Sequence, residues 1–273
     1  MPTSPTDPPS DDVRPRGPVP VPGGSGTVAE SARSTAARRR AIVGLLVALV
    51  AAGGLTWLVA SGSGAPLPLD QTLTDATRAW ADPAVWPVDL AHSIGLVTAP
   101  LWSALAASVL VIALLLTGYR AAGGLIARSG IAGVATSETV KAAVGRPRPP
   151  GAELYEPDLD KSFPSGHAME GIYLYLATGL VLIHLGRATG RRWMQQVGVA
   201  LVVVGPLIGL SRLVLGVHWP SDILAGWAFG SAALLASALI LWGPLERGWG
   251  GGRRGVIDPG QPEADATPGP PAG

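Results

Sequence analysis

The chain has 273 residues, of which 48% are hydrophobic and 14% are charged, and its formal net charge at pH 7 is +1. A soluble domain needs more charged side chains on its surface, so this balance favours a membrane protein, and the short, scattered basic clusters give no reason to expect nucleic acid as a partner. Because the chain has no cysteine, disulfides, zinc–thiolate sites, iron–sulfur clusters and thiol nucleophiles are excluded.

Both ends of the chain have the composition of disordered tails. Residues 1–37 are rich in Pro, Ser, Thr, Gly and Asp, and residues 244–273 are dominated by Gly, Pro and Arg. Such segments bury too little apolar surface to offset their chain entropy. We therefore predict two disordered cytoplasmic tails on either side of a membrane domain over residues 38–243.

Six apolar stretches lie between the tails, each near the ~20 residues that a helix needs to cross ~30 Å of hydrocarbon. They cover residues 41–60, 98–118, 121–141, 167–186, 194–215 and 222–242. In lipid the backbone must satisfy its own hydrogen bonds, which favours helices over open sheets. The sequence thus predicts an all-α, polytopic membrane bundle of six transmembrane helices. The first stretch is longer than the ~7 to 15 apolar residues of a signal peptide, so we expect it to be retained.

The basic residues predict the orientation of the bundle. If the six stretches alternate, short basic clusters fall on one side of the membrane, at residues 38–40, 120, 187–192 and 247–254. Lys and Arg in short connections favour the cytoplasm. We therefore expect a multi-pass protein of the plasma membrane with both termini in the cytoplasm. Residues 61–100 and 142–166, and the turn around His218, then face the outer side.

Three polar clusters occur at the outer ends of the last four stretches. Their sequences are KAAVGRPRP from Lys141 to Pro149, PSGH from Pro164 to His167, and SRLVLGVHWPSD from Ser211 to Asp222. All three project to the same membrane face in the predicted topology. Their coincidence on one face predicts an active site there.

The fixed cations in these clusters suit a phosphoryl group. Lys141, Arg148 and Arg212 provide guanidinium forks and a point charge for phosphate oxygens. Ser165 and Gly166 begin the fourth stretch, where free N–H groups and the helix dipole favour an anion. Two other interpretations stay open: Ser165 as a simple helix cap, and the cations as anchors that snorkel to the membrane surface.

Two histidines carry the expected chemistry. His218 and Asp222 are four residues apart, so they can share a helix face, with the carboxylate holding one ring nitrogen while the other attacks. His167, from a different helix, can then protonate the departing oxygen. No metal is needed for this chemistry.

The chain resembles the type 2 phosphatidic acid phosphatase superfamily, which includes undecaprenyl diphosphate phosphatases and, more distantly, vanadium haloperoxidases. The family signature is Lys-x6-Arg-Pro, Pro-Ser-Gly-His and Ser-Arg-x5-His-x3-Asp. Each part matches without a gap, at Lys141/Arg148/Pro149, at Pro164 to His167, and at Ser211/Arg212/His218/Asp222. The resemblance covers about residues 40–243 and excludes both tails.

This resemblance implies a role for each matching residue. His218 forms a phosphohistidine, His167 protonates the leaving group, and Asp222 supports His218. Phosphate is bound by Lys141, Arg148, Ser165, Gly166 and Arg212, and neither a metal nor a cofactor is implied. The family spacing selects Arg148, which leaves Arg146 as an auxiliary candidate.

Several charged residues lie outside the signature. Glu138 is three residues before Lys141, so we expect it to position that lysine. Glu170 is one turn after His167 and either tunes it or has a structural partner, whereas Arg128 faces the bundle or snorkels. The acidic loop with Glu153, Glu156, Asp158 and Asp160 fits a lid and a solvated loop equally well.

The leading function is hydrolysis of a lipid phosphate or diphosphate, with membrane lipid as the surroundings. Undecaprenyl diphosphate is our first choice of substrate, and phosphatidate and phosphatidylglycerol phosphate remain open. One alternative is a phosphotransferase that passes the phosphoryl group or headgroup to an alcohol. Another is a non-catalytic carrier of lipid phosphates, although pure binding needs neither nucleophile nor acid. No sequence feature indicates an oligomeric state.

Overall fold

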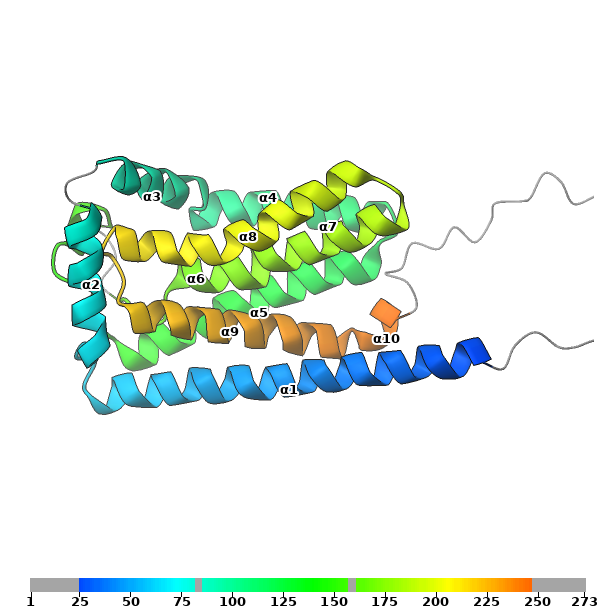
Figure 1. Ribbon diagram of the computed structural model, residues 1–273, viewed down its shortest axis with the longest axis horizontal. Helices are drawn as coiled ribbons and strands as arrows, with labels where there is room; N and C mark the ends of the chain where they lie inside the picture. The colour runs from blue at the N-terminus through cyan, green and yellow to red at the C-terminus, as the bar shows by residue number, and fades with distance from the viewer. Residues whose placement is uncertain (1–24, 82–84, 157–160, 247–273) are drawn as a thin grey trace, which may run out of the picture. The chain divides into compact units, whose positions relative to one another are not determined.

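The computed structural model describes residues 25–81, 85–156 and 161–246, and every regular element in them is a helix (Figure 1). The chain divides into two units, residues 1–37 and 38–273, and the second unit contains the helix bundle. The prediction of an all-α protein is confirmed. In chain order the elements are α1 (Ser25–Ser61), α2 (Pro68–Ala81), α3 (Val85–Val97), α4 (Pro100–Leu116), α5 (Arg120–Val144), η1 (Ala152–Leu154), α6 (Gly166–Glu170), η2 (Gly171–Leu176), α7 (Ala177–Ala188), α8 (Arg192–Val214), α9 (Pro220–Ile240) and α10 (Trp242–Glu246).

Among the described residues, four helical segments are long and apolar enough to cross a membrane, namely Ser31–Ser61, Gly166–Ala188, Arg192–Val214 and Pro220–Ile240. The number rises to five if α3 and α4, which are bent by 50° at their junction, are counted together as one span. The bend lies where Pro100 begins α4, because proline fits the first turn of a helix but lacks the N–H that a continuous helix needs. These segments make the chain an integral membrane protein.

The predicted stretch 121–141 corresponds to α5, which is helical over 25 residues but less apolar than the other spans. One face of α5 packs against neighbouring helices and carries small or polar residues. Ser129, for example, is fully buried, and its hydroxyl donates to the Tyr173 carbonyl at 2.9 Å. A helix that faces protein on one side needs fewer apolar side chains than one surrounded by lipid.

α1 begins at Ser25, so the helix extends into residues 1–37, for which the sequence predicts a tail. The added residues include Ala, Glu and Arg, which favour helix, and extending an existing helix avoids the cost of a new nucleus. The predicted C-terminal tail overlaps α10 at residues 244–246. Residues 1–24 and 247–273, including Arg247, Arg253 and Arg254, lie outside the described residues.

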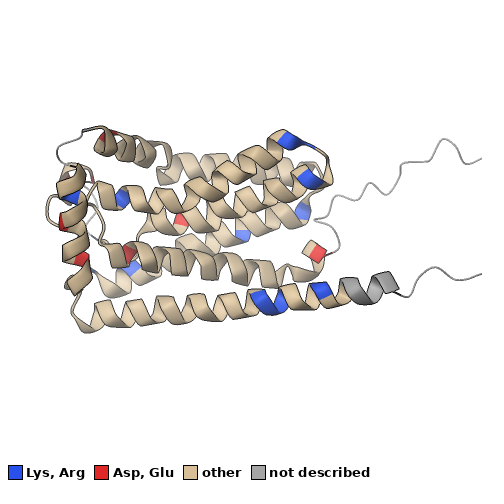
Figure 2. Ribbon diagram, in the orientation of Figure 1, with Lys and Arg blue, Asp and Glu red and all other residues tan. Residues whose placement is uncertain are grey.

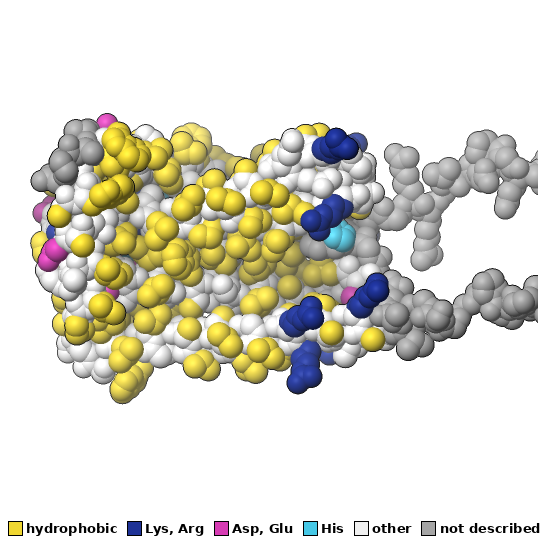
Figure 3. All heavy atoms as spheres, in the orientation of Figure 1, with side chains coloured by type: hydrophobic (Ala, Val, Ile, Leu, Met, Phe, Trp, Pro, Cys, Tyr) yellow, Lys and Arg dark blue, Asp and Glu magenta, His cyan; other side chains and the backbone are white. Residues whose placement is uncertain are grey.

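The spans lie side by side, and α2 crosses one end of them (Figure 1). The elements α6, η2 and α7 follow one another without a break and contact α5, α8 and α9. Figure 3 shows apolar side chains along the sides of these helices. Lys and Arg gather at the end where α7 turns into α8, whereas the end that α2 crosses carries acidic and basic residues together (Figure 2).

The closest helix contacts are between α8 and the span from Gly166 to Ala188. A Cβ added to Gly171 would collide with the carbonyl oxygen of Gly205, and one added to Gly179 would lie 2.6 Å from the Gly198 carbonyl. Small residues at helix contacts let two backbones approach closely in a membrane. Glycine at these positions therefore sets the distance between the two helices.

Gly171→Ala is expected to destabilise the protein by about 1 to 3 kcal/mol, because the added methyl group forces two packed backbones apart. The midpoint of thermal unfolding in detergent measures this change. Gly53→Ala is the matched control, since a Cβ at that position in α1 meets nothing within 4 Å. Equal midpoints for the two variants would show that the helices can separate without cost.

Candidate active site

His218 lies in the turn between α8 and α9 and is almost completely buried. Gly216, at φ +64°, lets the chain turn here. The ring Nδ1 of His218 lies 3.4 Å from Asp222 Oδ2, and its Nε2 lies 3.4 Å from Arg148 Nη1. The first distance is longer than a hydrogen bond, and the second is at the long end for one. One ring nitrogen thus faces a carboxylate and the other faces a cation.

The surroundings of His218 keep its ring neutral. Burial lowers the pKa of His218 well below its ordinary value, and the positive charges of Arg148 and Arg212 lower it further. His167 and Lys141 act in the same direction with smaller effects. A neutral imidazole has a free lone pair, which is the form that a nucleophile needs.

Lys141, Arg148 and Arg212 come from three segments and surround the same space. Arg148 Nη1 donates to the Val217 carbonyl at 2.8 Å, next to His218. A Cβ on Gly166 would lie 3.5 Å from Lys141 Nζ, so this lysine lies next to the start of α6. Together the three side chains form a cationic site beside His218 Nε2.

Glu156 occupies this cationic site. Its Oε2 lies 2.5 Å from Arg148 Nη1, and its Oε1 accepts from Arg212 Nη2. The side chains of both arginines are less than a tenth exposed. A carboxylate held by two guanidinium groups takes positions that two phosphoryl oxygens can take. The sequence analysis placed Glu156 only in an acidic loop. Its position shortly after the Arg-Pro motif could have indicated that it lies near Arg148.

Ser165 caps the helix that carries His167. Its hydroxyl accepts from the Ala168 N–H at 3.4 Å, and its own N–H donates to the Asp222 carbonyl at 3.0 Å. Ser165 is therefore the N-cap of α6, as one of the interpretations from sequence holds. The bond from its N–H to Asp222 connects the start of α6 to α9. His167 is half-buried, and its Nε2 has no hydrogen-bond partner among the described residues. The charges of Lys141 and Arg148 lie close enough to act on it.

Arg146 points away from the cationic site. Its side chain is completely buried and bonds to Asp222 Oδ1 at 2.6 Å and to Asp70 Oδ2 at 2.7 Å. The two arginines of the Arg-Pro-Arg-Pro run thus have different neighbours, because Arg148 faces His218 while Arg146 faces two carboxylates. Asp70, on α2, was not singled out by the sequence.

Glu138 lies at the edge of the site. Its Oε1 is 3.9 Å from Lys141 Nζ, and 71% of its side chain is exposed. An exposed pair at this distance contributes little to stability. The positioning role of Glu138 stays a prediction. In the described ranges 25–81, 85–156 and 161–246, no three His, Asp or Glu side chains are grouped so that they could hold a metal ion.

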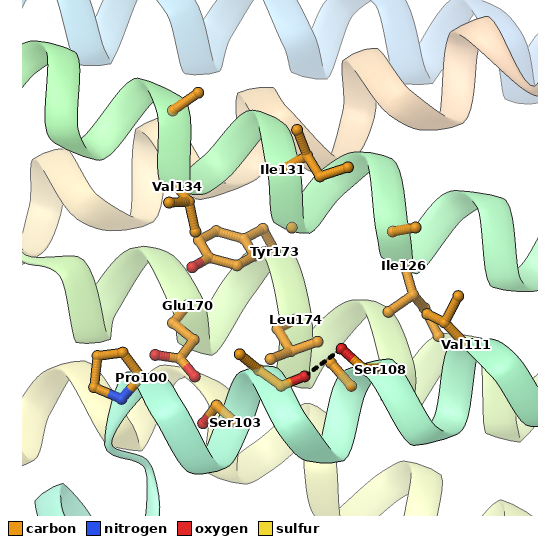
Figure 4. Close-up of a pocket in the computed structure, with 15 residues that line it drawn as sticks. Pro100, Ser103, Ser108, Val111, Ile126, Ile131, Val134, Glu170, Tyr173 and Leu174 are labelled. Atoms are coloured by element: carbon orange, nitrogen blue, oxygen red, sulfur yellow. Dashed lines mark hydrogen bonds between the residues drawn. The ribbon is translucent and has the colours of Figure 1, made fainter.

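A largely apolar cavity of about 610 Å³ lies between α4 and α5 (Figure 4). Glu170 and Tyr173, from the span that begins at Gly166, contribute to its wall, and the Glu170 carboxylate points toward Pro100 and Ser103 (Figure 4). Glu170 is one helical turn after His167, so the cavity adjoins the helix that carries this histidine. Its volume lies in the range of sites that bind small molecules.

Comparison with known proteins places the site in a family. A model of the PAP2 superfamily matches residues 118–244, which include all three polar clusters. Undecaprenyl-diphosphatase of Sulfolobus acidocaldarius is 38% identical over 96 residues, which are 34% of this chain and 41% of that protein. Phosphatidylglycerophosphatase B of Bacillus subtilis is 33% identical over 95 residues, 34% of this chain and 45% of that protein. The chain thus spans less than half the length of these curated relatives.

A solved structure shares the fold. The crystal structure of a transmembrane PAP2-type phosphatidylglycerolphosphate phosphatase from Bacillus subtilis aligns with a TM-score of 0.56 and 23% sequence identity. The alignment covers 76% of this chain and 96% of that one. At this identity the likeness describes the fold, which is that of a membrane protein.

Proposed function

This chain belongs to the PAP2 superfamily, and on that premise we propose that it is a metal-independent lipid phosphatase that works through a phosphohistidine. The observation that carries the proposal is the carboxylate of Glu156 between Arg148 and Arg212, next to the Nε2 of a neutral His218. An anionic group of the size of a phosphoryl group fits there with a nucleophile at its side.

The reaction begins when the phosphoryl group of a lipid displaces Glu156 from the two arginines. His218 Nε2 then attacks phosphorus, and the bond from phosphorus to the leaving oxygen breaks. His167 gives its proton to that oxygen, and Asp222 holds the Nδ1 proton of the now cationic ring. In the second step a water oxygen attacks phosphorus while His167 takes up a proton from the water. The bond from phosphorus to His218 Nε2 breaks, which returns His218 to its neutral form and releases inorganic phosphate.

The lipid nature of the substrate is supported by the cavity between α4 and α5. It is apolar, lies at the level of the spans and adjoins the helix of His167. We propose undecaprenyl diphosphate as the first substrate to test, because the relative from Sulfolobus acidocaldarius is named an undecaprenyl-diphosphatase. Phosphatidylglycerol phosphate is the second, from the name of the Bacillus subtilis relative.

The proposed topology has six spans, with α5 and the bent pair of α3 and α4 crossing the membrane. The basic residues at the end where α7 turns into α8 favour the cytoplasm for that end (Figure 2). Six spans, an even number, then put both termini on the cytoplasmic side in this proposal. The site around His218 then opens to the outer side of the plasma membrane. Labelling of single cysteines introduced near Arg191 and near Glu153 with an impermeant reagent tests this orientation.

The test of function is phosphate release by the detergent-solubilised protein with a chelator present. Undecaprenyl diphosphate, phosphatidate and phosphatidylglycerol phosphate are offered in turn, and the His218→Ala protein is the blank. Release that needs His218 and persists with the chelator supports the phosphatase. Formation of a new phosphoester with an added alcohol in place of free phosphate favours the phosphotransferase, and binding without turnover favours the lipid carrier.

Glu156→Gln is expected to lower the inhibition constant of inorganic phosphate by about tenfold, equivalent to 1.4 kcal/mol of binding free energy. The reason is that a neutral amide competes less well than a carboxylate for Arg148 and Arg212. Inhibition of turnover by added phosphate measures the change. Glu153→Gln, an exposed residue of the same loop, is the control. An unchanged constant would contradict competition between Glu156 and phosphate.

A further inference from the structure

A buried network connects α2 with Asp222. The guanidinium group of Arg146 lies between two carboxylates, with Nη2 bonded to Asp70 Oδ2 at 2.7 Å and Nη1 bonded to Asp222 Oδ1 at 2.6 Å. The side chains of all three residues are at most 2% exposed. Water therefore cannot substitute for any of these contacts, and each charge depends on the others.

Both carboxylate oxygens of Asp70 are used. Oδ1 accepts from the Ser221 N–H at 2.9 Å, and Oδ2 accepts from the Ser221 hydroxyl at 2.7 Å as well as from Arg146. The Leu67 N–H adds a bond of 2.9 Å to Oδ2. Burial alone would raise the pKa of Asp70, but the hydrogen bonds from Arg146 and Ser221 outweigh it and hold the pKa below its ordinary value. Asp70 is therefore ionised at neutral pH.

This arrangement determines which oxygen of Asp222 faces His218. Oδ1 is held by Arg146, which leaves Oδ2 for the Trp219 N–H at 2.9 Å and for His218 Nδ1 at 3.4 Å. Because Arg146 also binds Asp70, its positive charge is shared between two carboxylates. Without the charge of Asp70, the guanidinium group would act on Asp222 alone and weaken the hold of that carboxylate on a cationic His218 ring.

We propose that Asp70 is a positioning residue for the reaction at His218, acting through Arg146 to orient Asp222 so that its Oδ2 faces the His218 ring. This inference rests on the proposed function, since it concerns the same reaction. It gives α2 a part in the chemistry, although α2 lies outside the residues that match the family model. It also accounts for Arg146, which does not reach the phosphate site.

The test is Asp70→Asn, which keeps the shape of the side chain and removes its charge. The turnover number kcat is expected to fall by about tenfold or more, as is typical when a group that orients a functional side chain is removed. The KM for the lipid and the inhibition constant of inorganic phosphate are expected to stay unchanged, because Lys141, Arg148 and Arg212 are not touched. All three constants are measured on the full chain in detergent.

Two variants of α2 serve as controls. Asp75→Asn makes the same chemical change at an exposed position and is expected to behave as the wild type. Thr74→Gly removes a buried side chain and loosens the helix without contacting Arg146. It is expected to lower the midpoint of thermal unfolding while kcat per folded molecule remains that of the wild type.

The proposal is overturned if Asp70→Asn keeps kcat within about twofold of the wild type, because the loss of the orientation of Asp222 is expected to have a larger effect. It is also overturned if KM and phosphate inhibition change together with kcat, or if Thr74→Gly loses the same kcat at an equal loss of stability. A wild-type protein that releases no phosphate from any lipid contradicts the proposed function and the inference together, whereas the other outcomes concern Asp70 alone.

If the Asp70→Asn protein does not fold, a second variant tests the positioning role of Asp70. Ser221→Ala removes the hydroxyl that joins Asp70 Oδ2 to Arg146 Nη1 and leaves every charge in place. It is expected to lower kcat by about threefold, the effect of a single hydrogen bond, with KM unchanged. A wild-type kcat in this variant contradicts the proposal.

Discussion

Replacement of His218 by alanine is expected to lower the rate of phosphate release by about 10⁴-fold or more, because the reaction loses the atom that attacks phosphorus. Binding of inorganic phosphate is expected to persist, since Lys141, Arg148 and Arg212 supply the cationic site. The decisive measurement uses lipid labelled in its phosphoryl group. Wild-type protein quenched during turnover is expected to carry an acid-labile label, and the His218→Ala protein is expected to carry none.

The control for this experiment is His184→Ala. His184 is an exposed histidine on α7, at the end of its span away from His167, and its replacement is expected to leave both turnover and labelling unchanged. Turnover that survives in the His218→Ala protein would contradict the phosphohistidine. Labelled His218→Ala protein would assign the nucleophile to another side chain.

Asp222→Asn is expected to lower kcat by about 10² to 10⁴-fold with a small change in KM. A carboxylate fixes the Nδ1 proton of His218 and stabilises the cationic ring, whereas an amide can present its NH₂ group to the ring and lacks the charge. Because Asp222 also binds Arg146 and the Trp219 N–H, the variant is expected to unfold at a lower temperature too. Rates are therefore measured well below the unfolding midpoint of the variant.

Asp89→Asn is the control for the charge change, since Asp89 is exposed on α3. The loss expected for Asp222→Asn exceeds that for Asp70→Asn, because Asp222 touches the histidine while Asp70 acts through Arg146. Equal losses in the two variants would mean that the network acts as a single unit. A wild-type kcat in Asp222→Asn would remove Asp222 from the reaction.

The cationic site beside His218 was predictable from sequence because its residues occur in motifs with fixed spacing. His218 and Asp222 are four residues apart, so the turn that begins α9 brings them together whatever the rest of the chain does. Ser165 and Gly166 begin a helix for local reasons as well. Length and hydropathy likewise indicated most of the spans, because in lipid a helix satisfies the backbone hydrogen bonds within a single segment.

Other features depended on contacts between distant segments. Glu156 reaches Arg212 across 56 residues, and Asp70 reaches Arg146 across 76, so no local period relates these partners. Composition did not indicate the helix that α1 forms from Ser25 onward, because composition reports how much apolar surface a segment can bury, whereas a helix can continue from a neighbouring span without burying any.

The sequence by itself determined the class of the protein, most of its helices and the identity of the side chains that form the cationic site beside His218. The length of an apolar stretch, the position of basic residues and the spacing of a motif are local properties of the sequence. Interactions between residues close in sequence are enough to turn them into helices and helix ends. Only the tertiary structure decided which carboxylates Arg146 binds, that Glu156 occupies the cationic site, and that α2 contributes Asp70. Buried charges need partners, and the partner of a buried charge is set by which segments the fold brings within hydrogen-bond distance.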